Sequence, residues 1–131
     1  MSEMFDIAAF KNGVTDTAVL QIVNPVDGLP TNIKITLASV DSDRYRQASL
    51  RIQNEQLKAL EKGRNKASAE RLAAGSLDLL VSVTVSWEGI AENGVPLDCT
   101  PENVRRVYSE LPFIREQVDD FFADRRNFFK S

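Results

Sequence analysis

The residues best suited to acid–base chemistry in this chain are a few carboxylates. Glu88, Asp98 and the adjacent pair Asp119-Asp120 could act as proton donor and acceptor. A shared substrate would have to lie between two of these groups, but neighbouring residues on a helix point about 100° apart. Asp119 and Asp120 therefore do not converge on one substrate, and we do not expect the protein to be an enzyme.

Histidine is absent from the sequence, and cysteine occurs once, at Cys99. Without histidine the Ser-His-Asp and Cys-His arrangements of hydrolases cannot form, and a zinc site would depend on one thiolate and carboxylates. The triplet Asp41-Ser42-Asp43 could start an ion-binding loop, but no further oxygen donors follow at calcium-loop spacing. We expect no catalytic residues, no cofactor and no metal.

The composition is typical of one soluble domain. Hydrophobic residues make up 43% of the 131 residues and charged residues 27%, and no apolar run approaches the ~20 residues of a membrane helix. The first residues lack the basic and apolar regions of a secretion signal. The sequence therefore predicts a single domain over residues 1–131, in the cytoplasm and without membrane contact.

Charge is unevenly distributed along the chain. Residues 44–71 hold 8 basic and 3 acidic side chains, whereas residues 1–43 hold 2 and 6, and residues 72–131 hold 6 and 10. A positive segment of this kind attracts acidic partners. Because aromatic residues are not interleaved with the basic ones, we expect no nucleic-acid binding.

A β-hairpin is predicted over residues 17–38. Residues 18–23 and 32–37 are rich in β-branched residues and alternate in polarity. The Asp-Gly pair at 27–28 supplies the positive-φ positions that a chain reversal needs. For residues 1–16, which precede the hairpin, the sequence predicts a flexible arm or a short helix.

Residues 41–131 are predicted to be mainly helical. The acidic triplet at 41–43 can cap a helix whose apolar residues follow the helical period from 45 to 60. Thr100 and Pro101 mark another helix start, and Pro112 ends that helix and can begin the next. The sequence thus predicts an α+β fold, predominantly α-helical, with an N-terminal β-hairpin followed by a bundle of about four helices.

Residues 77–87 carry two periodicities at once. Their apolar and polar residues alternate, which predicts a strand with only Leu80 out of pattern. A stripe through Leu80, Val83 and Trp87 would instead continue a helix from the alanine-rich run at 67–74. Pattern alone leaves both interpretations open.

The chain also carries an ordered series of short motifs after the hairpin and Asp41-Ser42. These are Trp87-Glu88-Gly89-Ile90, Gly94-Val95-Pro96-Leu97, Thr100-Pro101-Glu102-Asn103-Val104, Pro112-Phe113-Ile114-Arg115-Glu116-Gln117-Val118 and Asn127-Phe128-Phe129. Over residues 20–129 this order resembles the tail assembly chaperones of long-tailed bacteriophages. Members of that family are mostly helical in the region matching 66–87, so the resemblance favours helix there.

The resemblance implies a non-enzymatic helper that acts in the cytoplasm of the host bacterium. It would coat the long, helical tape-measure protein, keep it soluble, and give way to the major tail protein as the tube polymerises. It would self-associate and be absent from the finished virion. The alternative is a structural phage protein, such as a head-tail adaptor or tail component, that stays in the particle.

Two surfaces are candidates for contact with a partner protein. Phe122, Phe128 and Phe129 are the first, because adjacent phenylalanines near a chain end are either a plug onto the domain or an exposed anchor. The basic helix face of Arg44, Arg51 and Lys58 is the second, as a docking surface for an acidic partner.

Overall fold

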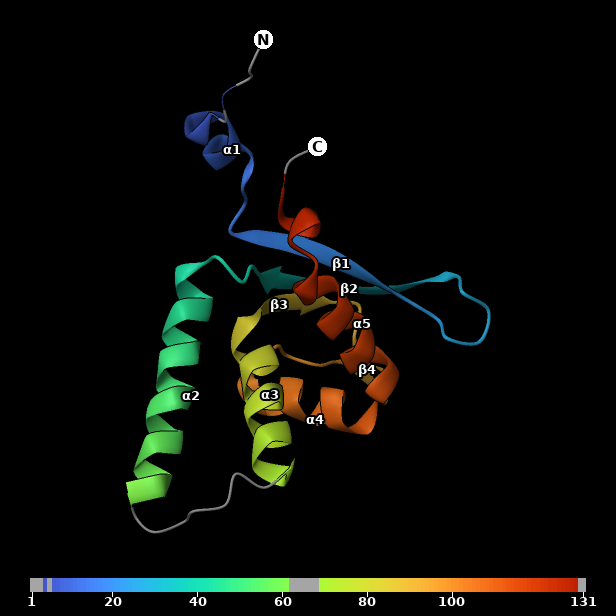
Figure 1. Ribbon diagram of the computed structural model, residues 1–131. Coiled ribbons are helices and arrows are strands. Elements are labelled where there is room, and N and C mark those ends of the chain that lie inside the picture. The colour runs from blue at the N-terminus through green and yellow to red at the C-terminus, as the bar shows by residue number, and fades with distance from the viewer. Residues whose placement is uncertain (1–3, 5, 62–68, 130–131) are drawn as a thin grey trace.

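The computed structural model of the protein describes residues 4, 6–61 and 69–129. The fold is α+β and mostly helical, as predicted, with a small antiparallel sheet on one side of the helices (Figure 1). In chain order the elements are α1 (Ile7–Gly13), β1 (Thr17–Val23), β2 (Pro30–Ala38), α2 (Asp43–Glu61), α3 (Ala69–Val83), β3 (Thr84–Glu88), β4 (Ala91–Glu92), β5 (Val95–Pro96), α4 (Pro101–Glu110), α5 (Pro112–Ala123) and the 3-10 helix η1 (Arg125–Phe128).

The predicted N-terminal hairpin is confirmed. Strands β1 and β2 pair antiparallel, with Leu20 opposite Ile35. Of the Asp-Gly pair in the connecting turn only Gly28 has a positive φ, 72°, so the prediction of positive φ is wrong for Asp27. Because side chains alternate across a strand, one face of this pair of strands is apolar and lies on the helices. Ile22, Ile35 and Leu37 on that face are fully buried. The arm before the hairpin contains one short helix, α1.

Residues 77–87, which carry two periodicities, are part helix and part strand. It is helical up to Val83, with Leu80 buried, and extended from Thr84 onward. The extended part, β3, pairs antiparallel with β2 and places Trp87 opposite Ile35. A third strand therefore lies inside the region predicted as helical, because β2 offers a free edge that a β-branched segment can pair with.

The two proline-marked helices begin where the sequence predicts. The Thr100 side chain accepts a hydrogen bond from the backbone N–H of Asn103, and Pro101 is the first residue of α4. Pro112 opens α5 directly after α4. Tyr108 from α4 and Val118 from α5 are almost completely buried beneath the sheet. With α2 and α3, these give the four helices expected after the hairpin.

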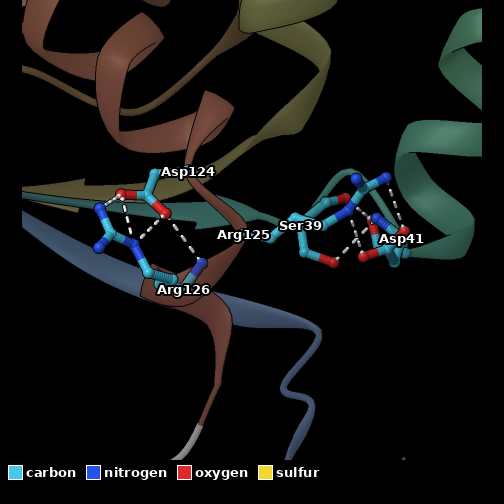
Figure 2. Close-up of polar contacts among 6 residues, drawn as sticks. Ser39, Asp41, Asp124, Arg125 and Arg126 are labelled. Atoms are coloured by element: carbon cyan, nitrogen blue, oxygen red, sulfur yellow. Dashed lines mark hydrogen bonds and ion pairs between the residues drawn. The ribbon is translucent and has the colours of Figure 1, made fainter.

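The C-terminal segment closes back onto the start of the sheet. The carbonyl oxygen of Phe128 accepts hydrogen bonds from the backbone N–H and hydroxyl of Thr15, at 2.7 and 2.8 Å. Figure 2 shows the next contact, in which the Arg125 guanidinium binds the Asp41 carboxylate before α2, with Nε to Oδ2 at 3.1 Å. Contacts between residues far apart in the sequence therefore hold the C-terminal segment against the start of the sheet and the start of α2.

Asp124 organises the turn that leads into η1. Its carboxylate accepts hydrogen bonds from the backbone N–H and the guanidinium of Arg126 (Figure 2). The hydrogen bonds from Arg126 lower the pKa of the Asp124 carboxyl. This local pair fixes where α5 ends and the final turn begins.

Candidate protein-binding surface

Two of the three phenylalanines expected at a partner surface are core residues. The Phe128 side chain is 2% exposed, and its ring packs edge-on against Phe121 with ring centroids 5.7 Å apart. Phe122 is 8% exposed and packs against Tyr45 at the same centroid distance. In the folded protein neither ring is available to a partner. Phe128 is therefore a plug onto the domain and not an exposed anchor. Phe129 is 38% exposed.

Two of the three basic residues expected on α2 come together at the end of α3. The Arg44 guanidinium donates to the carbonyl oxygens of Ser82 and Thr84, with Nε 2.6 Å from the first and Nη2 3.3 Å from the second. The Arg51 guanidinium donates to the Ser82 hydroxyl at 2.8 Å. A cation stabilises the carbonyl end of a helix, because the helix dipole is negative there. Arg44 therefore also has a structural role.

Lys58 lies apart from this pair of arginines. It is exposed, two turns beyond Arg51 on α2, and no ion pair links it to the described part of the chain. The seven-residue spacing does put the three side chains on one stripe of α2. Of the three, only Arg44 and Arg51 form hydrogen bonds with the end of α3 and the start of β3.

Arg44 and Arg51 line an open cavity of about 370 Å³ between α2, the end of α3 and the start of α4. A third basic residue, Arg105 on α4, lies on the opposite wall and is paired with Asp78. We call this cavity, defined by its three arginines, the arginine cleft. Arg105 was missed in the sequence because no periodicity relates residues on α2 to residues on α4.

The charges around the arginine cleft do not cancel. Arg51 pairs with Glu55 at 3.5 Å and Arg105 pairs with Asp78, whereas Arg44 binds only neutral carbonyl oxygens. Among the described residues no carboxylate forms an ion pair with Arg44. The cleft therefore holds one positive charge in excess.

Cys99 also lines the arginine cleft. Its side chain is half-buried, and burial raises the pKa of the thiol above its usual value, with the Arg44 charge acting in the opposite direction. The raised pKa lowers the fraction of thiolate, so Cys99 reacts more slowly with electrophiles than an unperturbed cysteine does.

Three exposed leucines lie on the opposite flank of α2, among polar residues. Leu50, Leu57 and Leu60 are 54%, 57% and 49% exposed, and their spacing puts them on one side of the helix. Of the 19 residues of α2, all of them described, only Ala48 is buried. Figure 1 shows why, since α2 runs beside α3 at the outer edge of the molecule, away from the sheet. We call these three residues the leucine face.

Shallow hollows follow the same flank of α2. One of about 320 Å³ includes Tyr45, Ser49 and Leu50, and another of about 260 Å³ includes Ser49 and Leu79 of α3. The two hollows share Ser49, and Leu50 of the leucine face lines the first of them. The three-leucine periodicity is visible in the sequence, but whether such a stripe faces the core or solvent depends on the tertiary packing.

Neither a metal-binding group nor a membrane-spanning helix is found among the described residues. None of their cysteine, aspartate and glutamate side chains form a group of three that could hold a metal ion, and Asp119 and Asp120 lie exposed on α5. Within the same part of the chain, no helix is long and apolar enough to cross a membrane. Two surface features are candidates for contact with a partner protein: the leucine face on α2, and the arginine cleft between α2, α3 and α4.

Comparison of the chain with protein-family models, with curated proteins and with solved structures finds no significant match. The leucine face and the arginine cleft are consequently interpreted from their own geometry and charge.

Proposed function

We propose that the protein is a tail assembly chaperone of a long-tailed bacteriophage. It binds the tape-measure protein in the host cytoplasm through the leucine face of α2 and keeps it soluble until the major tail protein replaces it. The observation that supports this proposal is the position of three half-exposed leucines on a helix that has only one buried residue. A long helical client has the complementary apolar stripes.

The size of the leucine face suits reversible binding. Covering a half-exposed leucine contributes about 1 kcal/mol, so three of them give a weak contact on their own. Copies that also contact one another along one long client gain a combined affinity that each copy alone lacks. Each contact can then be released separately as tube subunits arrive. An amphipathic helix laid into a groove is the recognition mode that this geometry supports.

The test is co-expression with the tape-measure protein from the same phage genome. We expect the wild-type chain to keep that protein soluble and to co-purify with it. The variant Leu50→Ser, Leu57→Ser, Leu60→Ser should fold but fail to do so, because the apolar stripe is gone.

The matched control replaces exposed valines away from α2, with Val26→Ser and Val95→Ser, which are 91% and 65% exposed. This control should rescue the client as well as the wild type does. Full rescue by the triple leucine variant would overturn the proposal.

The structural-protein alternative rests on a different feature. Strand β1 lies at the edge of the sheet, and an edge strand can extend a sheet between subunits. Mass spectrometry of purified particles separates the two functions, because a chaperone is missing from the finished virion and a tail component is present at subunit level.

A further inference from the structure

We propose that the arginine cleft is a docking site for acidic side chains of a protein segment, with Arg44 as the residue that receives a carboxylate. The inference goes beyond the proposed function, because it concerns the other flank of α2 and an ionic rather than an apolar contact. The observations that support this inference are the excess positive charge in the cleft and the shape of the cleft.

The position of the Arg44 side chain suits the binding of an anion. A guanidinium has five N–H donors, and the two carbonyl oxygens of Ser82 and Thr84 engage two of the Arg44 nitrogens. These neutral acceptors fix the side chain without compensating its charge. A carboxylate that binds the remaining donors therefore gains a charge-assisted contact without having to order a flexible side chain.

Arg51 lies on the same wall of the cleft. Its guanidinium and the Arg44 guanidinium both bind Ser82, one at the hydroxyl and the other at the carbonyl oxygen. Ser82 thus holds two cationic groups at one end of the cavity. A segment with two neighbouring carboxylates fits this arrangement better than a single acidic residue does.

The walls of the cleft favour a peptide over a nucleic acid. A volume of about 370 Å³ accommodates a few side chains, and Val85, which is 37% exposed, provides apolar contact for their methylene groups. The residues that line the cavity include no aromatic side chain on which a base could stack.

The single cysteine of the chain provides a local readout. Cys99 lines the cleft, so an occupant should slow alkylation of its thiol by N-ethylmaleimide, which is uncharged. The probe is a capped hexaglutamate peptide at constant ionic strength. We expect severalfold protection of Cys99 in the wild type, decreasing as salt is added, because salt screens the contact.

Two variants and one control decide the outcome. Arg51→Gln removes one cation, and Ser82→Asp places a carboxylate between the two arginines, so both should abolish protection while circular dichroism shows a folded chain. Arg46→Gln makes the same charge change on α2, but Arg46 pairs with Asp43 and lines the hollow that contains Leu50. This control should keep protection.

Failure of the peptide to protect wild-type Cys99, or equal protection in Arg51→Gln, would overturn the inference. Protection by a single-stranded oligonucleotide but not by the peptide would overturn it as well. The triple leucine variant should still be protected, so the result does not depend on whether the leucine face binds a client.

Discussion

The hydroxyl oxygen of Tyr108 on α4 lies 2.7 Å from Oγ1 of Thr84, the first residue of β3. Thr84 donates its single hydroxyl proton to the carbonyl oxygen of Leu80, at 2.8 Å, so the Tyr108 hydroxyl donates to Thr84. Both side chains are buried. This chain of hydrogen bonds ties α4 to the point where α3 changes into a strand.

The direction of this hydrogen bond predicts unequal effects of its two deletions. Thr84→Val leaves a buried Tyr108 donor without an acceptor, and should lower the free energy of unfolding by about 1–3 kcal/mol. Tyr108→Phe leaves the hydrogen bond from Thr84 to Leu80 in place and should cost about 1 kcal/mol. Urea unfolding followed by the fluorescence of Trp87, the single tryptophan, measures both. Equal losses would mean that Tyr108 is not the donor.

Ionisation of Tyr108 should make stability depend on alkaline pH. Burial, the largest cause, raises the pKa of this phenol above its ordinary value, and the hydrogen bond with Thr84 acts against the shift. The stabilisation is fully present below the unfolded-state pKa of about 10 and is lost as pH rises from there toward the folded-state pKa.

Between pH 10 and 11 the free energy of unfolding of the wild type should therefore fall faster than that of Tyr108→Phe, by up to about 1.4 kcal/mol per pH unit. Urea titrations of the two proteins at matched pH give the difference. Parallel curves would assign the alkaline loss to other groups.

Local signals in the sequence were enough for the elements that are defined by their own residues. The Asp-Gly pair at 27–28 and the alternating strands around it determine the hairpin. Thr100, Pro101 and Pro112 determine two helix boundaries, because caps and prolines act within a few residues. These boundaries agree with the structure to the residue at Pro101 and Pro112.

Long-range pairing and burial could not be obtained in the same way. Thr84 begins a strand because β2 lies beside it, and nothing within residues 77–87 records that neighbour. Phe128 is buried because η1 folds back over the sheet, whereas its place near the chain end suggests exposure. The arginine cleft combines residues from α2 and α4, which only the tertiary fold brings together.

Gly89 and Gly94 have similar backbone angles but should respond differently to alanine. Both have positive φ, 83° and 81°, which costs an L-residue about 1–2 kcal/mol. A Cβ at Gly89 would lie 1.9 Å from the backbone oxygen of Asn32, whereas a Cβ at Gly94 meets no atom within 4 Å.

Gly89→Ala should therefore force β3 away from β2 and strongly lower the melting temperature, and Gly94→Ala should lower it only slightly. Thermal unfolding monitored by circular dichroism makes the comparison. A similar change in both variants would show that the approach of Gly89 to Asn32 is not tight in solution.

The two adjacent phenylalanines at the end of the chain should separate cleanly by mutation. Phe128→Ala removes a buried ring that packs against Phe121 and should lower the free energy of unfolding by about 3–5 kcal/mol. Phe129→Ala removes a ring that is 38% exposed and should cost clearly less. Urea unfolding of each single variant gives the two values.

This difference determines how the C-terminal end can be tested as a binding surface. A client that is lost with Phe128→Ala would report unfolding, since the mutation damages the core. A client that is lost with Phe129→Ala, in a chain whose unfolding curve is nearly unchanged, would report a contact made by that exposed ring. If Phe128→Ala unfolds at the same urea concentration as the wild type, η1 does not pack on the sheet in solution, and Phe128 returns to the list of surface anchors.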